Sequence, residues 1–338
     1  MTRAHAPAQP QGSGDKLSKC EWRLKPVAGL MKRDFLSLHD LDVAEMGALL
    51  DLAAEVKAHP GDYSKVLAGK AAALIFEKPS LRTRVTFEVG LAQLGGSATY
   101  LAPADISLGR REAVKDVARN LARWVQVLII RTFGHEILEE MAREASIPIV
   151  NALSDLHHPC QAVADVLTLR EYKGSLKGLK LAFVGDGNNV AHSLLQAGAK
   201  LGLHVTVACP RGFEPDAVVF RQARQDAAAT GARLLVVNDP ADGVFEADAV
   251  YTDVWTSMGQ ESEAAERRDL FAPYQVNSYL MSLAKPDALF LHCLPAHRGE
   301  EVTDQVLDGP HSVVLDQAEN RLHVAKAVLL ALLRGEPR

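Results

Sequence analysis

The sequence contains little cysteine, and its few cysteines are far apart. Cys20, Cys160, Cys209 and Cys293 include no pair with the close spacing of a zinc or a thiol redox motif. Four cysteines in 338 residues also argue against a disulfide framework, and they favour a protein of a reducing compartment.

Long apolar runs and a surplus of basic charge are absent as well. The longest apolar stretches, such as residues 71–76 and 127–130, have the length of buried strands and fall short of the ~18–20 residues that cross a bilayer. The 37 lysines and arginines are outnumbered by 42 acidic residues, whereas nucleic-acid-binding proteins are usually basic. We therefore expect neither a membrane nor a nucleic acid as a partner.

The N-terminal segment lacks the apolar stretch of a secretory signal peptide. It is rich in Ala, Pro, Gln, Gly and Ser, so residues 1–33 are predicted to form a flexible tail. The alternative, a transit peptide, is supported only by a few basic residues. Together with the scattered cysteines, these features predict a cytoplasmic protein.

The rest of the sequence has the balance of a soluble globular protein, with 48% hydrophobic and 23% charged residues. From Phe35 onward, short apolar strands alternate with helices, which predicts the α/β class with two domains, each a parallel sheet flanked by helices. The polar segment 173–178 is the predicted boundary between residues 34–173 and 174–320, and a final helix within 321–338 is expected to pack back on the first domain. In the second domain, strands are predicted at residues 180–184, 204–208, 233–237, 249–254, 288–292 and 313–316.

The segment Ser80-Leu81-Arg82-Thr83-Arg84 follows a predicted strand and opens a helix. Free backbone N–H groups and the positive end of the helix dipole favour an anion at such a place. Ser80 is suited to cap the helix, and arginine side chains match phosphate or carboxylate geometry. The alternative is a capped surface helix with two solvated arginines, and these residues alone do not decide between the two.

Polar residues also follow the next two strands of the first domain. Arg131 ends one strand, and His158 and Gln161 lie where Pro159 starts a helix after the next strand. A lone histidine is more often structural than catalytic. However, three polar segments at one edge of a parallel sheet indicate a binding site.

The turn Gly185-Asp186-Gly187-Asn188-Asn189 suggests a dinucleotide site only weakly. The third glycine of that motif would fall at Val190, and no acidic residue after the following strand is placed to hold a ribose. A tight strand-to-helix turn is the preferred interpretation, with two asparagine amides at the ligand-binding edge of the sheet.

Two later segments also leave strands. The segment 253–259 has the small polar residues of a mobile loop, and the segment 292–299 contains Cys293. Cys293 is a candidate nucleophile, metal ligand or plain buried thiol, and no close Cys or His partner favours metal. Asp and Cys at strand ends are also suited to hold the amine of a substrate.

Together these segments resemble the aspartate/ornithine carbamoyltransferase family, from about Asp34 to Leu333. The resemblance rests on five stretches in the same order, which are 76–84, 158–161, 185–189, 253–259 and 292–299. The first two resemble the part shared by all carbamoyltransferases. The Ser257-Met258-Gly259 loop and His292-Cys293-Leu294-Pro295 resemble the ornithine branch and argue against the aspartate one.

The resemblance implies two ligand sets in a cleft between the domains, and no metal or organic cofactor. For carbamoyl phosphate it implies Ser80, Leu81, Arg82, Thr83, Ser107, Arg131, His158, Gln161, Cys293, Leu294 and Arg321. For ornithine it implies Asn189, Asp253, Ser257 and Met258, and for catalysis Arg82, Arg131, His158, Asp253 and Cys293.

Two positions depart from the family pattern. The family usually has Thr where this chain has Leu81, so a backbone contact survives there while a hydroxyl contact is lost. The family implies a homotrimer in which one residue reaches into the neighbouring subunit's site, often Gln or His. Here that residue is Ser107, which is too short to repeat the contact directly.

The expected activity is transfer of the carbamoyl group of carbamoyl phosphate to the δ-amine of L-ornithine, which gives L-citrulline and phosphate in arginine metabolism. Arg131, Thr83 and His158 would stabilise charge on the carbonyl oxygen, and Arg82 would neutralise the departing phosphate. The alternatives are the same transfer to another amine such as putrescine, an NAD-dependent dehydrogenase, and a non-catalytic sensor on the same fold.

Overall fold

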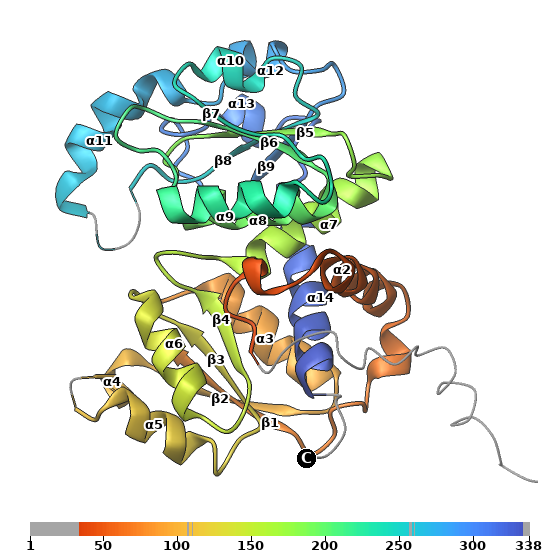
Figure 1. Cartoon of the computed structure of the whole chain (residues 1–338), viewed down its shortest axis with the longest axis vertical. Helices are drawn as coiled ribbons and strands as arrows, with labels where there is room; N and C mark the ends of the chain where they lie inside the picture. Colours follow the sequence, from red (N-terminus) through yellow and green to blue (C-terminus); the bar gives the residue numbers. More distant parts are fainter. Residues whose placement is uncertain (1–33, 107, 110, 257–258, 260, 334–338) are drawn as a thin grey trace, which may run out of the picture.

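The protein forms two α/β lobes that are stacked along its long axis (Figure 1). The computed structural model describes residues 34–106, 108–109, 111–256, 259 and 261–333. Each lobe is built on a parallel sheet with helices on its faces, as the alternating pattern of strands and helices predicts.

The first sheet has the strand order β2-β1-β3-β4, and every pairing is parallel. The side chains of the two central strands are mostly apolar and almost all buried, which is typical of a sheet covered on both faces. The strands are β1 (Ala71–Phe76), β2 (Ser97–Leu101), β3 (Val127–Arg131) and β4 (Ile149–Leu153). The helices of this part are α2 (Val43–Ala58), α3 (Leu81–Gln93), α4 (Pro103–Ile106), α5 (Val114–Leu121), α6 (His135–Glu144) and α7 (Pro159–Lys173).

The second sheet has the order β7-β6-β5-β8-β9, again with parallel pairings throughout. Its strands are β5 (Lys180–Val184), β6 (His204–Ala208), β7 (Leu234–Val237), β8 (Ala249–Thr252) and β9 (Leu289–His292). Its helices are α8 (Asn189–Leu201), α9 (Ala217–Ala227), α10 (Pro240–Val244), α11 (Ala264–Phe271), α12 (Ser278–Ser282) and α13 (Asp304–Leu307). Short 3₁₀ turns are η1 (Leu38–Asp40), η2 (Pro60–Tyr63), η3 (Glu261–Glu263) and η4 (Ala272–Tyr274).

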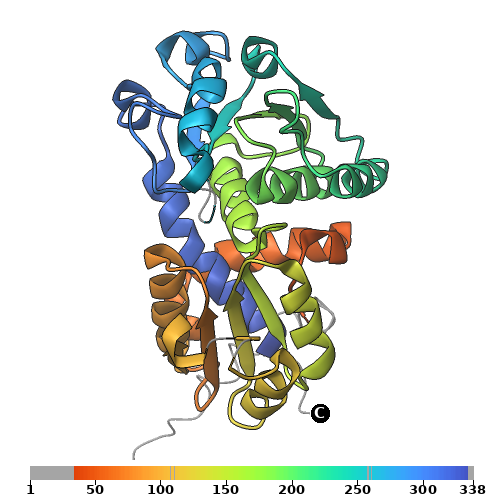
Figure 2. The ribbon, with the colours of Figure 1, turned by 90° about the vertical axis from the view of Figure 1, so that its left-hand side faces the viewer.

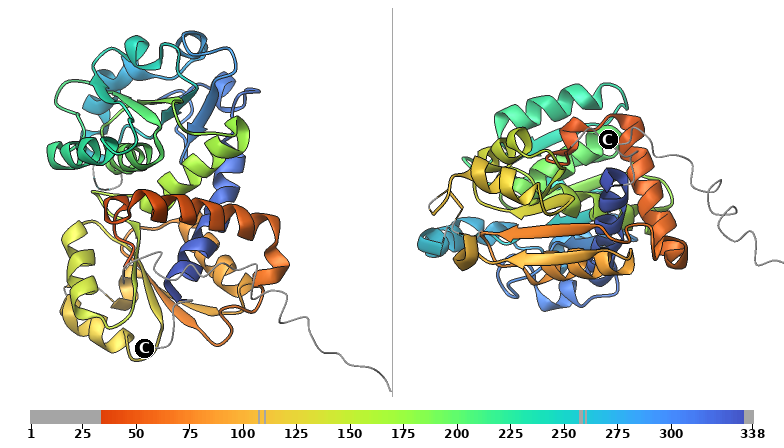
Figure 3. Two further views of the ribbon diagram at one scale, coloured as in Figure 1. Left: turned by 45° about the vertical axis from the view of Figure 1, so that its right-hand side comes forward. Right: turned by 90° about the horizontal axis from the view of Figure 1, so that it is seen from below.

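The last helix, α14 (Val314–Leu333), joins the two lobes. It begins beside β9 and packs against α7, α3 and α2, as the dark blue helix in Figure 2 shows. Figure 3 shows α2 lying along the junction of the two lobes, and α2 also contacts α8 of the second lobe. A single apolar core therefore runs from the first sheet through these helices to the second.

The predicted strand at residues 313–316 is wrong, and the last helix starts at Val314 instead of Arg321. Phe290 donates from its backbone N–H to the carbonyl oxygen of His311, and Val313 donates to that of Phe290. The chain therefore forms one isolated bridge, between Ser312 and Phe290 of β9, and α14 begins two residues later. Val314 and the residues after it form the first turn of α14, and the Val314 side chain is buried.

None of the described helices combines the length and the apolar character that a membrane span requires.

Candidate active site

A cavity of about 780 Å³ lies between the two sheets and is lined by residues from both. In the first sheet, β2 lies on one side of β1 and the later strands β3 and β4 lie on the other. In the second sheet, β6 and β7 lie on one side of β5, and β8 and β9 on the other, so the strand order reverses beside β1 and beside β5. The carboxyl ends of parallel strands at such reversals are the preferred ligand-binding places of α/β folds. Loops that follow β1, β3, β4, β5, β8 and β9 all reach this cavity.

The first turn of α3 forms part of the cavity wall. Ser80 caps the helix, since its Oγ accepts a hydrogen bond from Thr83 N–H at 3.3 Å. Leu81 is 74% exposed, so its side chain is not buried against the protein, while Ser80, Leu81 and Arg82 all line the cavity. The helix therefore presents its N-terminal N–H groups and Arg82 to the same space, which suits an anion.

Arg131 ends β3 and is buried at the cavity wall. The pairing of β3 with β4 shifts register between Ile130 and Arg131, and such an irregularity re-aims a side chain. Burial lowers the pKa of Arg131 to about 10, and the nearby Arg321 acts in the same direction. Its Nε has no hydrogen-bond partner within the described residues, so one of its donors is available to a ligand.

Arg321 of α14 is the third arginine at this end of the cavity. It is buried and donates from Nη2 to Thr83 Oγ1 at 2.7 Å. Among the described residues, none of Arg82, Arg131 and Arg321 forms an ion pair with a carboxylate. Three guanidinium groups without a counter-ion create a place for a multiply charged anion.

His158 lies next to this arginine group, at the N-cap of α7. Burial lowers the pKa of His158 well below its usual range, and the charges of Arg321 and Arg131 lower it further. The imidazole is therefore neutral at pH 7. Its Nδ1 is buried and has no hydrogen-bond partner in the part of the chain that the structure describes.

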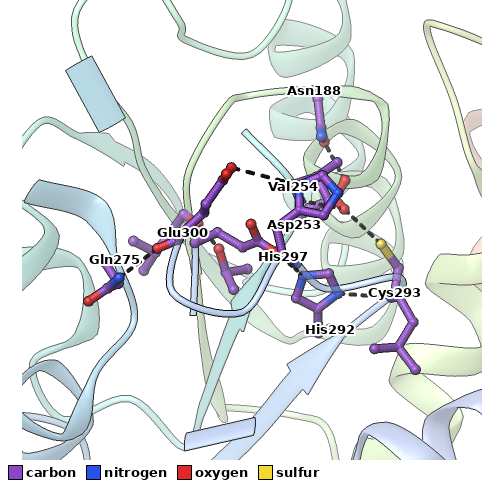
Figure 4. A network of polar contacts seen from close by, with 12 residues as sticks. Asn188, Asp253, Val254, Gln275, His292, Cys293, His297 and Glu300 are labelled. Atoms are coloured by element: carbon purple, nitrogen blue, oxygen red, sulfur yellow. Dashed lines mark hydrogen bonds and ion pairs between the residues drawn. The ribbon is translucent and has the colours of Figure 1, made fainter. Parts of the chain in front are cut away.

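The opposite end of the cavity belongs to the second sheet. Cys293 Sγ donates to Asp253 Oδ1 at 2.9 Å, and Asn188 Nδ2 donates to Asp253 Oδ2 at 2.8 Å. Figure 4 shows this row from Asn188 through Asp253 to Cys293. Burial and the carboxylate of Asp253 raise the pKa of Cys293 well above its usual range, so the group is a thiol and a weak nucleophile.

The segment after β9 is held in an unusual conformation. Leu294 has a φ of 57°, and its peptide bond to Pro295 is cis. Leu294 N–H donates to His292 Nδ1 at 2.8 Å, so His292 Nε2 carries the proton that Glu301 Oε1 accepts at 3.1 Å. A positive φ in a leucine is uncommon and is typical of functional loops.

Two groups of side chains have metal-ligand geometry. Their ligand atoms lie within 4.8 Å of one another, and the groups are Asp253 with His292 and Cys293, and His297 with Glu300 and Glu301. In the first group, both His292 nitrogens and the Cys293–Asp253 contact are already engaged in hydrogen bonds. Interactions within the chain therefore account for that arrangement.

The structure brings most predicted site residues to this cavity. Ser80, Leu81, Arg82, Arg131, His158, Asn189, Asp253, Cys293, Leu294 and Arg321 line it. Thr83 and Gln161 do not line the cavity themselves. Thr83 accepts a hydrogen bond from the lining residue Arg321, and Gln161 lies one helical turn after the lining residue His158. Ser107, Ser257 and Met258 fall outside the described residues.

Asn189 lines the cavity and also contacts the first lobe. Its Nδ2 donates to the carbonyl oxygen of Ser154 at 2.6 Å, which links the two lobes. The amide that contacts Asp253 belongs to Asn188, whose Oδ1 also caps α8. Gly187 is explained by packing, because a Cβ there would lie 2.4 Å from Pro215 N, and Gly185 by its φ of 139°, which favours glycine.

Sequence reasoning did not single out several charged residues of the cavity, among them Lys78 and Arg267. Lys78 pairs with Asp155 and lies 4.1 Å from the Phe133 ring centre, and it stands in the same predicted loop as Ser80. Arg267 of α11 donates to Asp186 Oδ2 and to the carbonyl oxygen of Trp255, each at 2.8 Å. No motif marks Arg267, because its partner Asp186 is 81 residues away in the sequence.

Comparisons with known proteins agree with this arrangement. Residues 33–171 match the carbamoyl-P binding domain of the aspartate/ornithine carbamoyltransferase family, and residues 177–332 match its Asp/Orn binding domain. The chain belongs to the aspartate/ornithine carbamoyltransferase family, and the predicted resemblance and the two-domain α/β fold are confirmed.

The similar proteins are ornithine carbamoyltransferases. The enzyme of Halalkalibacterium halodurans is 54% identical over 312 residues, which is 92% of this chain and 98% of that protein. The solved structure of ornithine carbamoyltransferase from Pyrococcus furiosus has a TM-score of 0.89 and 52% identity, and covers 91% of this chain and 99% of that one. The structure from Thermus thermophilus has a TM-score of 0.81 and 48% identity, with 90% and 99% covered.

Proposed function

We propose that the protein transfers the carbamoyl group of carbamoyl phosphate to the δ-amine of L-ornithine, and that L-citrulline and phosphate are the products. The observation that carries this proposal is the division of the cavity. Three arginines that form no ion pair with any described carboxylate lie on the first lobe and α14, while Asp253 and the Cys293 thiol lie on the second lobe. A dianion and an amino acid are the ligands that suit these two ends.

The phosphate end is assigned to Arg82, Arg131, Arg321 and the N-terminus of α3. These groups supply positive charge and N–H donors in a partly closed cavity, where hydrogen bonds to developing charge are strongest. Attack of the amine places negative charge on the carbonyl oxygen, and Arg131, Thr83 and neutral His158 are the donors assigned to it. Arg82 stabilises the phosphate as it leaves.

The amine end is assigned to Asp253, Cys293, Asn189 and, from the family resemblance, Ser257 and Met258. The Asp253 carboxylate orients the amino acid, and the Cys293 thiol remains protonated beside it. The attacking δ-amine must lose a proton, and the leaving phosphate is the base assigned to accept it. Positioning two reactants in one cleft supplies much of the remaining rate enhancement.

A panel of amines tests the proposal directly. Wild-type protein is mixed with carbamoyl phosphate and either L-ornithine, putrescine, L-lysine or L-aspartate, and phosphate release is recorded. We expect L-ornithine to exceed every other amine by at least ~100-fold in kcat/KM, because buried groups that pair with the α-carboxylate would stay unpaired with putrescine. Equal rates with putrescine would favour the alternative substrate, and no phosphate release with any amine would refute carbamoyl transfer.

We also propose that the protein acts in the cytoplasm, in arginine biosynthesis, as a homotrimer with shared sites. The three described cysteines are free thiols, which suits a reducing compartment. Apolar side chains on the first lobe are exposed in the single chain, among them Trp124 at 69% and Leu81 at 74%.

Mixing two inactive variants tests the shared site. Ser107→Trp is expected to block a neighbour's site, and Arg131→Ala to disable the site of its own chain. Dissociation and reassociation of the two variants together should restore part of the wild-type activity, because cyclic symmetry creates junctions with both residues intact. Hybrid trimers that form but recover nothing would refute the shared site.

A further inference from the structure

Asp165 of α7 is a buried carboxyl group that has no part in the reaction as described above. Its Oδ1 accepts hydrogen bonds from Gln161 Nε2 at 2.7 Å and from Gln317 Nε2 at 2.6 Å. Burial raises the pKa of Asp165 to about 7, and the two amide hydrogen bonds oppose that rise. A polar group buried at such a cost calls for a physical explanation.

These hydrogen bonds form a row from His292 through Gln317 and Asp165 to Gln161, and the His292 end fixes which atom donates in each of them. The backbone N–H of His292 can only donate, and it donates to Gln317 Oε1 at 3.0 Å. Gln317 must therefore turn its Nε2 toward Asp165, and Asp165 Oδ1 is an acceptor whether the carboxyl group is ionised or protonated at Oδ2. The Gln161 atom that faces Asp165 Oδ1 is then the donor Nε2.

This leaves Gln161 with its carbonyl oxygen directed away from Asp165. Gln161 is fully buried, and its Oε1 has no hydrogen-bond partner in the described part of the chain. Gln161 and His158 are three residues apart at the start of α7, so they share one side of it, and His158 lines the cavity. An unpaired buried acceptor is costly, and a donor N–H of a bound ligand would remove that cost.

We propose that Asp165 is a positioning residue that holds the Gln161 amide with its carbonyl oxygen toward the substrate, so that the site selects an acyl phosphate whose acyl group carries an N–H. The inference rests on the proposed function and adds a selectivity device to it. The family resemblance already implies Gln161 as a ligand of carbamoyl phosphate, whose amino group is the donor that Gln161 Oε1 would accept; the new element is the role of Asp165. Through Gln317 the same carboxyl group also connects this half of the site to the segment that begins at His292.

Acetyl phosphate is the matched probe, because a methyl group replaces the amino group while the carbonyl and the phosphate remain. Inorganic phosphate probes the arginine end alone. The Kd values of freshly dissolved carbamoyl phosphate, acetyl phosphate and inorganic phosphate are measured by calorimetry on the full chain. We expect wild-type protein to bind carbamoyl phosphate at least about tenfold more tightly than acetyl phosphate.

Three variants separate positioning from general structure. Asp165→Leu has a similar volume but no acceptor, so the preference for carbamoyl over acetyl phosphate should fall to within about threefold, while the Kd of inorganic phosphate changes less than about twofold. Asp165→Asn keeps a carbonyl oxygen and should retain the preference. Gln317→Leu removes the other amide from Asp165 but leaves Gln161 held, so it should also retain the preference.

A double-mutant cycle then shows whether Asp165 acts through Gln161. Gln161→Leu alone should abolish the preference, and adding Asp165→Leu to it should cause no further loss. If Asp165→Leu does not fold, as judged by circular dichroism, Asp165→Ala takes its place, since it also removes the acceptor for the Gln161 amide.

The proposal is overturned if folded Asp165→Leu, or the variant that replaces it, keeps the full preference. It is also overturned if inorganic phosphate binding weakens as much as carbamoyl phosphate binding, or if Asp165→Asn loses as much as Asp165→Leu. None of these measurements uses ornithine. Wild-type protein that binds carbamoyl phosphate selectively but transfers nothing to ornithine would therefore refute the proposed function and leave this inference standing.

Discussion

Arg321 donates a hydrogen bond of 2.7 Å to the hydroxyl of Thr83, 238 positions earlier in the sequence. The contact ties the last helix of the chain to the first turn of α3, where Ser80 caps the helix. Because Arg321 also lines the cavity, the anion-binding end of the site depends on how α14 packs against α3. We draw the following predictions from this and the other contacts of the cavity.

Replacing Arg82 by Ala should abolish most of the activity. The change removes one charged donor from the developing phosphate, and losing one transition-state donor costs about 3 kcal/mol, which is more than 100-fold in kcat/KM. Arg84→Ala is the matched control, since Arg84 is two residues away, is itself exposed, pairs with partly buried Glu88 and does not line the cavity. Steady-state kinetics of both variants decide the point, and similar losses in the two would contradict the assignment.

Replacing Cys293 by Ala should weaken the use of ornithine far more than the binding of carbamoyl phosphate. The Sγ contact with Asp253 is lost, and the carboxylate then orients the amine less well. Cys209→Ala, which removes another buried thiol away from the cavity, should behave like the wild type. Mass spectrometry of the quenched reaction should find no carbamoyl group on Cys293, because a protonated thiol is a poor nucleophile.

Much of the fold follows from local patterns in the sequence. The central strands of the first sheet, β1 and β3, are almost entirely apolar, and the polar residues that follow the strands of each sheet lie at one edge of it. Arg82, Arg131 and His158 could therefore be predicted as neighbours, since parallel strands of one sheet bring their carboxyl ends together. Asp253 and Cys293 follow strands of the other sheet, and only the family resemblance placed them in the same site.

Other features depend on contacts that no local pattern encodes. The apolar residues at 313–316 have the composition of a strand, but a single bridge to β9 and packing against α7 make them the start of a helix. The role of Arg267 depends on Asp186 and on a backbone carbonyl that the fold alone brings near. The contact of Asn188 with Asp253 and that of Asn189 with the carbonyl oxygen of Ser154 likewise depend on how α8 is placed in the fold.

Replacing Arg267 by Gln should raise KM for ornithine and leave the Kd of carbamoyl phosphate nearly unchanged. Arg267 joins α11 to the turn that contains Asp186, and its side chain is 7% exposed. Losing charge-assisted hydrogen bonds of this kind costs about 1.5–3 kcal/mol, which corresponds to a rise of roughly 10-fold or more. The neighbouring Arg268→Gln is the control, because Arg268 is 59% exposed and pairs with Glu300 at the surface. Equal effects of the two changes on KM would contradict this role.

The stability of the fold should decrease as the pH falls from 7 to 5, and His157 should account for part of the decrease. Burial, together with the neighbouring His135 and His192, lowers the pKa of His157 to about 3. Below pH ~6.5 His157 is protonated in the unfolded chain but not in the folded chain, so the fold loses stability as the pH falls through that value. The group contributes a loss of about 2 kcal/mol between pH 7 and pH 5.

The His157→Phe variant keeps an aromatic ring but does not titrate. Urea unfolding at one protein concentration should show that this variant loses about 2 kcal/mol less than the wild type between the two pH values. Replacing exposed His59 by Phe should leave the wild-type dependence in place. An unchanged dependence in His157→Phe would show that His157 is not the group responsible.

Carbamoyl transfer to the δ-nitrogen of ornithine is tested most directly by observing the bond that forms. Wild-type protein is supplied with ¹³C-carbamoyl phosphate and L-ornithine labelled with ¹⁵N only at the δ position, and the reaction is followed by NMR. The account predicts a carbonyl carbon of citrulline split by one-bond coupling to the δ-¹⁵N, together with one phosphate released for each citrulline. A ¹³C product without that coupling, or phosphate release with ornithine unchanged, would contradict it.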